Sequence, residues 1–297
     1  MAADPPSPPP RWTHRLEAVI AALAGGVVAL LPLDWASGLG GALGRWIGPR
    51  LGISRRARRN LHDAMPELGP AKIEAVIRGM WDNLGRIAFE YPHLRRIAVF
   101  AQGGRVKARG LEHLDRAIAA KRSVIMFSGH LGNWEIAALA AGQYGLDVAQ
   151  IYRAANNPII DRMVARLRGH SGELIPKGSV ASRRAVAALR RGGHLSLLAD
   201  QKLNDGIPVP FFGRDAMTAP ALAVLALRFH CDVLPVRVER LNGARFRLTV
   251  YPALPMPQTG DRDADTAALM SAVNQILETW IRERPEQWFW LHRRWPE

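Results

Sequence analysis

Residues 123–141 read Ser123-Val124-Ile125-Met126-Phe127-Ser128-Gly129-His130-Leu131-Gly132-Asn133-Trp134-Glu135-Ile136-Ala137-Ala138-Leu139-Ala140-Ala141. The apolar first part is typical of a buried strand, and the alanine- and leucine-rich last part is typical of a helix. A histidine and a carboxylate therefore lie where a strand gives way to a helix. Because α/β folds usually hold their ligands at this edge of the sheet, the stretch predicts an α/β fold with a site at His130.

His130 and Glu135 are five positions apart. On one helix they would lie about 140° apart around the axis, so the chain must turn between them before they can meet. Gly129 and Gly132 permit such a turn. About one His-x4-Asp/Glu pair is expected by chance here, and the sequence holds three: His62/Glu67, His130/Glu135 and His292/Glu297. Only the middle pair has the strand–glycine–helix context, so we expect His130 to be catalytic.

Strand and helix patterns alternate along much of the chain. Apolar runs predict strands at 123–127, 147–152, 194–199 and 233–240. Helical spacing predicts helices at 70–88, 133–142, 158–169, 181–191, 219–229 and 264–284. Asn242-Gly243 lies between two apolar runs and predicts a hairpin. The sequence therefore predicts an α/β fold with a mixed sheet flanked by helices.

Polar residues recur where the predicted strands end. The first strand leads to His130, the second to Arg153 with Asn156 and Asn157, and the third to Asp200. In a parallel arrangement these strand ends meet at one edge of the sheet. We therefore expect His130, Arg153 and Asp200 to line one pocket.

The composition points to an anionic partner. The net charge is +14, and arginine supplies most of it, since lysine occurs at only five positions. A coding bias towards Ala, Arg and Gly explains part of this excess, but nucleic acid, an anionic membrane and a phosphorylated substrate all fit it. Nucleic acid is disfavoured because aromatic residues are only 7% and cluster at 288–290. The single Cys231 excludes an intramolecular disulfide and suggests a reducing compartment.

The N-terminal part differs from the rest. Residues 1–15 form a Pro-rich leader that we expect to be disordered. The apolar stretch within 16–50 has three interpretations: a signal peptide, a core helix, or a short membrane anchor continued by interfacial helices. We favour the anchor, which makes the N-terminal region membrane-facing. Arginines after it outnumber those before it, which predicts that the α/β domain, 51–297, lies in the cytoplasm.

Several motifs, taken together and in order, resemble those of the lipid A biosynthesis lauroyl/myristoyl acyltransferases, a family of the lysophospholipid acyltransferase superfamily. The resemblance covers about residues 15–295. The matching motifs are Arg59-Asn60-Leu61 with Met65-Pro66-Glu67-Leu68, Gly129 to Glu135, Tyr152-Arg153 with Asn157-Pro158-Ile159-Ile160-Asp161, Arg168, Leu198-Ala199-Asp200-Gln201, Val209-Pro210-Phe211-Phe212-Gly213, and Pro285 to Trp295.

The resemblance implies an enzyme of the bacterial inner membrane, with its catalytic domain on the cytoplasmic face. It would move a fatty acyl chain from acyl carrier protein or coenzyme A to a hydroxyl of a lipid A precursor, an anionic glycolipid. Another glycolipid or a lysophospholipid is the alternative acceptor. Neither a cofactor nor a metal is implied.

An alcohol has too high a pKa to attack a thioester unaided, and a histidine can serve as its general base at neutral pH. We assign that role to His130. Glu135 either orients His130 or pairs with an arginine such as Arg168, and Asp200 is the rival partner of the imidazole. Arg153 and Arg168 would bind phosphate or stabilise the oxyanion. Two further residues of the matching motifs are expected to support the substrate site: Asn157 and Asp161.

Overall fold

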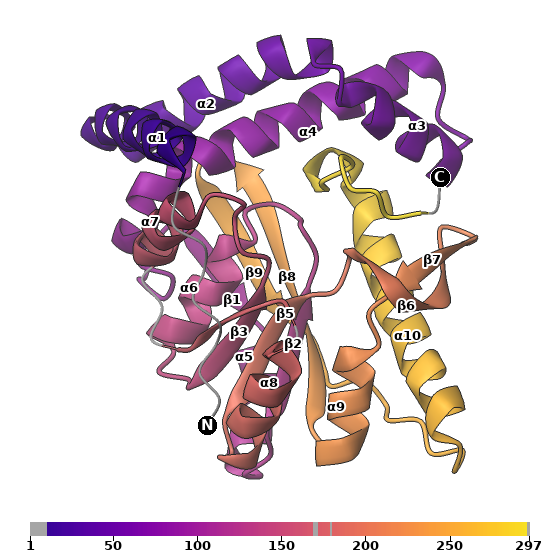
Figure 1. Ribbon diagram of the computed structural model, residues 1–297. Coiled ribbons are helices and arrows are strands. Elements are labelled where there is room, and N and C mark those ends of the chain that lie inside the picture. The colour runs from indigo at the N-terminus through magenta and orange to yellow at the C-terminus, as the bar shows by residue number, and fades with distance from the viewer. Residues whose placement is uncertain (1–10, 169–171, 179, 296–297) are drawn as a thin grey trace.

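The computed structural model describes residues 11–168, 172–178 and 180–295 (Figure 1). The helices are α1 (Trp12–Leu30), α2 (Leu33–Ile47), α3 (Ser54–Ala64), α4 (Pro70–Glu90), α5 (Leu111–Ala119), α6 (Glu135–Gln143), α7 (Pro158–Arg168), α8 (Ala181–Arg190), α9 (Ala221–Phe229) and α10 (Arg262–Glu283), with the short 3-10 helices η1 (Gly48–Arg50), η2 (Tyr91–Arg96) and η3 (Pro285–Gln287). The strands are β1 (Val106–Arg109), β2 (Val124–Ser128), β3 (Val148–Tyr152), β4 (Leu174–Pro176), β5 (His194–Leu198), β6 (Lys202–Phe211), β7 (Arg214–Thr218), β8 (Asp232–Asn242) and β9 (Arg245–Val250).

Seven of the strands form one sheet in the order β1-β9-β8-β2-β5-β3-β4. β2 lies between β5 and β8 and runs parallel to both, and β3 extends the parallel part beyond β5. β9 runs antiparallel to β8, so the sheet is mixed, as predicted. β6 and β7 form a separate antiparallel pair beside α10 (Figure 1).

Helices cover both faces of the sheet, and β2 is buried along its whole length. Ile125 and Phe127 join the core formed with α4, α8, α9 and α10. Val124 and Met126 join a second core with α5 and α6. The alternation follows from the period of two in a strand. Because helices cover both faces, we expect a ligand to bind at the ends of the strands.

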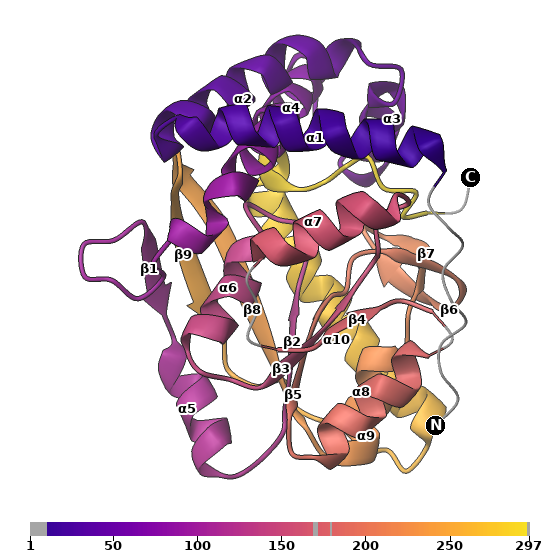
Figure 2. The same ribbon diagram turned by 60° about the vertical axis from the view of Figure 1, so that its left-hand side comes forward.

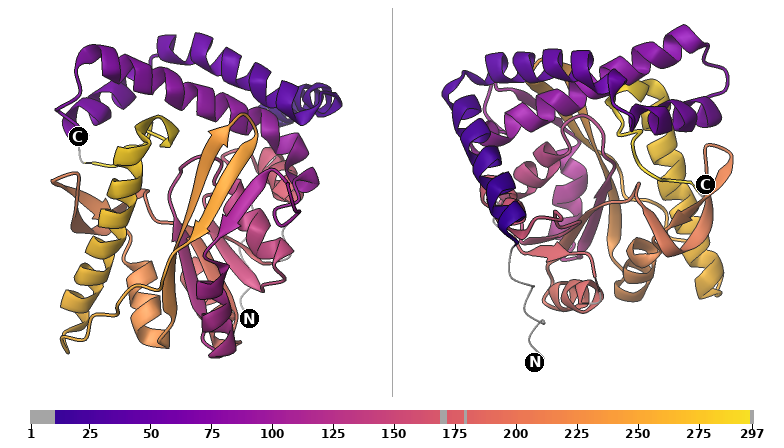
Figure 3. Two further views of the ribbon diagram at one scale, coloured as in Figure 1. Left: turned by 180° about the vertical axis from the view of Figure 1, so that it is seen from behind. Right: turned by 45° about the horizontal axis from the view of Figure 1, so that its top comes forward.

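The N-terminal helices lie across the carboxyl ends of the parallel strands (Figures 1 and 3). α2 packs directly on α4 because its buried face carries glycines. A side chain at Gly40 would clash with the carbonyl oxygen of Gly85, and one at Gly44 would clash with that of Trp81. The two helix backbones therefore touch, and the opposite face of α2 is exposed.

Helix α1 is mostly exposed, with Ala18 as its buried residue. Among the described residues it is the one helix long and apolar enough to cross a membrane, a test that a signal sequence or a core helix also passes. Its exposure argues against the core-helix interpretation. Residues 1–10 of the expected leader lie outside the described residues. The last part of the expected leader belongs to α1, which begins at Trp12.

The predicted strands and helices of the α/β region are confirmed to within a few residues, and residue 169 of one predicted helix lies outside the described residues. The hairpin at Asn242-Gly243 is confirmed by the β8–β9 pairing. Elements that the sequence patterns do not predict are β1, α5, β4 and the β6–β7 hairpin. β6 carries two prolines and several polar residues, which conceal the period of a strand.

Candidate active site

The turn after β2 places His130 against Asp200, the second residue after β5. β2 and β5 are parallel neighbours, so their carboxyl ends meet. His130 Nδ1 lies 2.7 Å from Asp200 Oδ1, and the His130 backbone N–H donates to Asp200 Oδ2 at 2.7 Å. Of the two candidate partners of the imidazole, Glu135 and Asp200, it is Asp200 that contacts it.

Asp200 is fully buried and accepts a further hydrogen bond from Trp288 Nε1 at 2.8 Å. Burial alone would raise the pKa of Asp200. The attraction of His130 and the hydrogen bonds that it donates outweigh burial and hold this pKa well below its usual value. An ionised Asp200 accepts from His130 Nδ1–H, which leaves His130 Nε2 as the nitrogen able to take a proton.

Gln201 and Lys177 support the same tautomer. Gln201 Nε2 lies 3.3 Å from His130 Nε2, and Lys177 Nζ lies 2.8 Å from Gln201 Oε1. Because an ammonium group only donates hydrogen bonds, Lys177 orients the amide oxygen of Gln201 towards itself and the amide NH2 towards His130. His130 Nε2 therefore accepts, with the proton on Nδ1.

His292 lies beside His130. The sequence context does not predict a place for it in the site, because His292/Glu297 is interpreted as a chance pair. The centroids of the two imidazole rings are 4.8 Å apart, and Phe289 packs against both. Burial, followed by the charge of His130, lowers the pKa of His292 to about 3, so it is neutral at pH 7. The aromatic run at 288–290 was the one sequence signal that this segment is buried.

Glu135, the first residue of α6, is buried and lines the same cavity as His130. It accepts from Arg168 Nε and Nη2 at 2.8 Å each, from the Tyr91 hydroxyl at 2.6 Å and from Trp134 Nε1 at 3.1 Å. Burial alone would lower the pKa of Arg168, but Glu135 raises it above the usual value. Trp134 links Glu135 to His130, because the Trp134 ring packs edge-on at 4.9 Å from the imidazole. Two roles are expected for Glu135, orienting His130 or pairing with an arginine. Its direct contact is the ion pair with Arg168.

A cavity of about 530 Å³ opens beside His130. As expected from the strand ends, Arg153 lines the same cavity, with Asp200 behind the imidazole. One part of the lining is apolar: Leu84, Ile87, Ala88, Trp134, Ile151, Leu198 and Phe289. Another part is polar: Tyr91, Gln150, Tyr152, Arg153, Asn156, Arg168, Lys177 and Gln201. The cavity can therefore accept a ligand with both a hydrocarbon part and an anionic part.

Asn157 and Asp161 lie behind this lining. Asn157 Oδ1 accepts from the backbone N–H of Ile159 at 3.0 Å and so begins α7. Asp161 accepts from the Tyr152 hydroxyl at 2.9 Å and from the Ala155 N–H at 2.8 Å. Asp161 therefore fixes the loop that carries Arg153.

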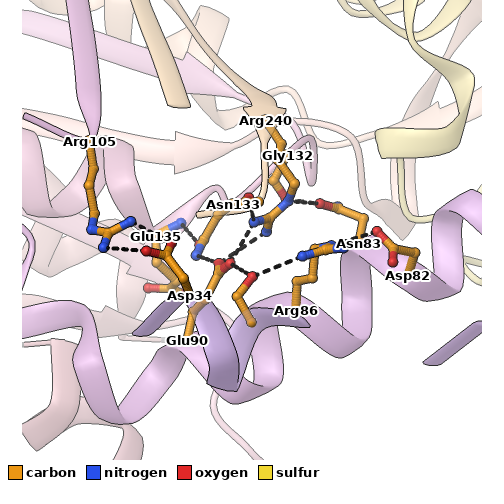
Figure 4. Close-up of polar contacts among 12 residues, drawn as sticks. Asp34, Asp82, Asn83, Arg86, Glu90, Arg105, Gly132, Asn133, Glu135 and Arg240 are labelled. Carbon is orange, nitrogen blue, oxygen red and sulfur yellow. Dashed lines mark hydrogen bonds and ion pairs between the residues drawn. The ribbon is translucent and has the colours of Figure 1, made fainter. Parts of the chain in front are cut away.

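A buried polar network holds the turn from behind (Figure 4). Glu90 forms two contacts with the Arg240 guanidinium, at 2.5 and 3.0 Å, and accepts from Asn133 Nδ2 at 2.8 Å. Asn83 donates to the Gly132 carbonyl at 2.9 Å. Gly132 has φ +54°, and a side chain there would meet the carbonyl oxygen of Val238. This explains why the motif has glycine at 132 and asparagine at 133.

Three side chains of the site are of the types that bind metal ions. One ligand atom from each of His130, Asp200 and His292 lies within 4.8 Å of the others. However, Asp200 already accepts three hydrogen bonds, one of them from His130 Nδ1, and a cation would have to displace these. The expectation that the site works without a metal stays a prediction.

The fold and the site define a class of protein. An imidazole that is oriented by a buried carboxylate at a strand end, with Nε2 beside Gln201 in the cavity lining, is the arrangement of a general base in an α/β enzyme. The adjoining cavity suits an amphiphilic substrate.

Sequence comparison identifies the family within that class. The family model for bacterial lipid A biosynthesis acyltransferases matches residues 9–297, and the chain belongs to this family. It is 27% identical over 279 residues to the lipid A biosynthesis myristoyltransferase of Escherichia coli K12, covering 92% of this chain and 84% of the relative. It is 28% identical over 259 residues to the lauroyltransferase of the same organism, covering 82% and 79%. It is also 25% identical over 258 residues to a phosphatidylinositol mannoside acyltransferase of Mycobacterium tuberculosis H37Rv, covering 83% and 78%. The protein is thus an acyltransferase of lipid A biosynthesis.

Proposed function

We propose that the protein transfers a fatty acyl chain from a thioester carrier, acyl carrier protein or coenzyme A, to a hydroxyl of a lipid A precursor. His130 is the general base of this transfer. The observation that carries this proposal is the contact of His130 Nδ1 with buried Asp200, which leaves Nε2 facing the cavity. Nε2 removes the hydroxyl proton as the oxygen attacks the thioester carbonyl carbon. When the tetrahedral intermediate collapses, the C–S bond breaks and the imidazolium returns the proton to the thiolate. The products are an ester and a thiol.

The remaining residues have supporting roles in this scheme. The Gln201 amide, held by Lys177, supplies N–H groups beside Nε2 for the oxyanion that forms on the thioester oxygen. Arg153, an exposed residue of the cavity lining, binds a phosphate of the acceptor. Arg168 instead holds Glu135 and so shapes the wall of the cavity. The apolar side chains from α4 accommodate hydrocarbon.

The protein acts at the bacterial inner membrane, with its catalytic domain, 51–297, on the cytoplasmic face. Residues 16–50 attach it there. The exposed tryptophans and leucines of α1 and α2 support this attachment, because such a surface is costly in water.

Replacement of His130 by Ala tests the base. We expect transfer to fall by about 10²–10⁴-fold with unchanged folding, because a general base contributes this much. His62→Ala is the matched control, since His62 is exposed and contacts Asp63 far from the cavity. The measurement is the initial rate of ester formation from acyl thioester and purified acceptor. Activity of His130→Ala within tenfold of wild type would remove His130 from the base role.

A second acceptor class is favoured by one observation, the 25% identity to the phosphatidylinositol mannoside acyltransferase. Lipid mass spectrometry of a deletion strain separates the two. Loss of one acyl mass from lipid A supports the first proposal, and loss of an acyl mass from another glycolipid supports the second.

A further inference from the structure

Helix α1 has two different faces. Its outer face carries large apolar residues, each more than half exposed: Trp12, Leu16, Ile20, Leu23, Val27 and Leu30. The residues on the other face are smaller and lie against α7 and η2, with Ala18 buried. A helix surrounded by lipid would be apolar on every side. The face of smaller residues against α7 and η2 therefore indicates that α1 packs on the protein along that face.

The protein holds α1 near both ends. Near the start, Asn157 Nδ2 donates to the His14 carbonyl and to Glu17 Oε2, both at 2.9 Å. Near the end, buried His93 Nε2 lies 3.2 Å from the Val28 carbonyl. These attachment points are about 20 Å apart along the axis. α1 therefore lies along the protein surface rather than projecting from it (Figure 2).

Helix α2 continues the exposed apolar surface. It buries its glycine face on α4 and exposes Trp35, Leu39, Leu43, Trp46 and Ile47. α1 and α2 meet at an angle on the same side of the molecule (Figure 3). Together their outer faces form one apolar platform. Exposed arginines, the marginal arginines, lie near its two ends in sequence: Arg11 and Arg15 at the start of α1, and Arg45 and Arg50 near the end of α2.

We infer that α1 and α2 lie flat in one leaflet of an anionic membrane and that α1 does not cross it. This inference rests on the proposed membrane attachment and specifies its geometry. If α1 crossed, either its contacts with α7 and η2 would break, or these elements would enter the hydrocarbon. They carry exposed arginines at 162, 166, 95 and 96, and each arginine at the bilayer centre costs about 3 kcal/mol or more. In the flat arrangement, apolar side chains enter the lipid and the marginal arginines face anionic headgroups.

The flat arrangement also places the cavity next to the lipid. Its lining includes Leu84, Ile87 and Ala88 on α4, the helix directly beneath α2, and the loop 153–156 beside Asn157. A lipid acceptor can therefore enter from the leaflet to which the enzyme is bound.

Depth-dependent fluorescence quenching tests the inference. In a Cys231→Ser background, single cysteines replace Leu16, Leu23 or Leu30, and Ile118 on α5 provides the control at the opposite end of the molecule (Figure 2). Each variant is labelled with a fluorophore and bound to vesicles of phosphatidylethanolamine and phosphatidylglycerol that carry nitroxides at a shallow or a deep position. We expect the three α1 labels to lie at one shallow depth and the Ile118 label to remain unquenched.

Two results would overturn the inference in different ways. A deep label at Leu23 with shallow labels at Leu16 and Leu30 means that α1 crosses the bilayer, while membrane attachment itself stands. Failure of the unlabelled wild type to float with these vesicles means that the attachment is wrong as well. Neither result bears on the base role of His130, which is measured with dispersed substrates.

Discussion

The contacts of the His130 ring come from three separate parts of the chain: Trp134, the segment 200–201, and the C-terminal segment with Phe289 and His292. Asp200 approaches Nδ1 from the end of β5, Gln201 approaches Nε2, and Trp134 and His292 pack on the ring itself. The two nitrogens are thereby distinguished, one as donor and the other as acceptor.

Replacement of Gln201 by Glu tests the contact at Nε2. A carboxylate beside this nitrogen stabilises the protonated ring, so we expect the acidic limb of the rate–pH profile to move to higher pH. Gln201→Met removes the amide without adding charge and should lower the rate without moving that limb. Identical profiles in both variants and wild type would mean that Gln201 does not act on the base.

His292 makes folding stability depend on pH. Its pKa falls from about 6.5 in the unfolded chain to about 3 in the folded protein. The unfolded chain therefore binds more protons between these values, and stability is lost as the pH falls through this window. We expect His292→Phe to reduce the loss of unfolding free energy between pH 7 and 5 by about 1–2 kcal/mol. Denaturant titrations at the two pH values measure this, and an unchanged loss in the variant would contradict it.

Residue roles were only partly predictable from sequence. The strand–glycine–helix context identifies His130, because local chemistry and local structure agree there. The choice between Glu135 and Asp200 depends on which strand lies beside β2, and no local pattern contains that order. His292 depends on a contact between segments more than 150 residues apart, which spacing arguments do not reach.

At the scale of elements, buried regular segments were predictable and irregular edges were not. β2 is apolar from Val124 to Phe127, and apolar residues predominate in β3, β5 and the first half of β8, because both sheet faces are covered. β4 is only three residues long, and β6 is exposed at half of its positions, so neither carries a clear hydrophobic period. The layer formed by α2 and α4 depends on glycines on both helices, which sequence periodicity does not weigh.

The Glu90–Arg240 pair joins α4 to β8 behind the catalytic turn, and Ser37 of α2 also donates to Glu90 at 2.7 Å. Arg240→Met would leave the Glu90 carboxylate buried without its charge partner. We expect a loss of about 3–5 kcal/mol of unfolding free energy. The double variant Glu90→Leu/Arg240→Met should lose much less, and Arg284→Met, at an exposed ion pair, less than about 1 kcal/mol. Equal losses in the single and double variants, measured by chemical denaturation, would contradict this account.

At the scale of the whole molecule, the net charge of +14 has more than one use. Some arginines are paired and little exposed, as the buried Arg240 and the partly buried Arg168 are. Others, such as Arg55 and Arg59 on α3, are exposed. Arg153 is the exposed arginine in the cavity lining, among the described residues. Only such exposed charges can attract an anionic lipid, and salt screens exposed charges over about 8 Å at physiological ionic strength.

Charge recognition of the acceptor can therefore be separated from membrane binding. A phosphorylated acceptor should react faster than its dephosphorylated analogue in one detergent, and the preference should shrink as salt rises. A purely apolar site would respond hardly at all or oppositely, because salts such as sulfate strengthen apolar burial. Arg153→Gln should reduce the preference while the folded structure persists, because Arg153 is exposed. Arg168→Gln is no test of phosphate binding, since it would leave buried Glu135 without its cation. If both acceptors react equally at low salt, the exposed arginines serve membrane docking alone, and the assignment of Arg153 to phosphate is wrong.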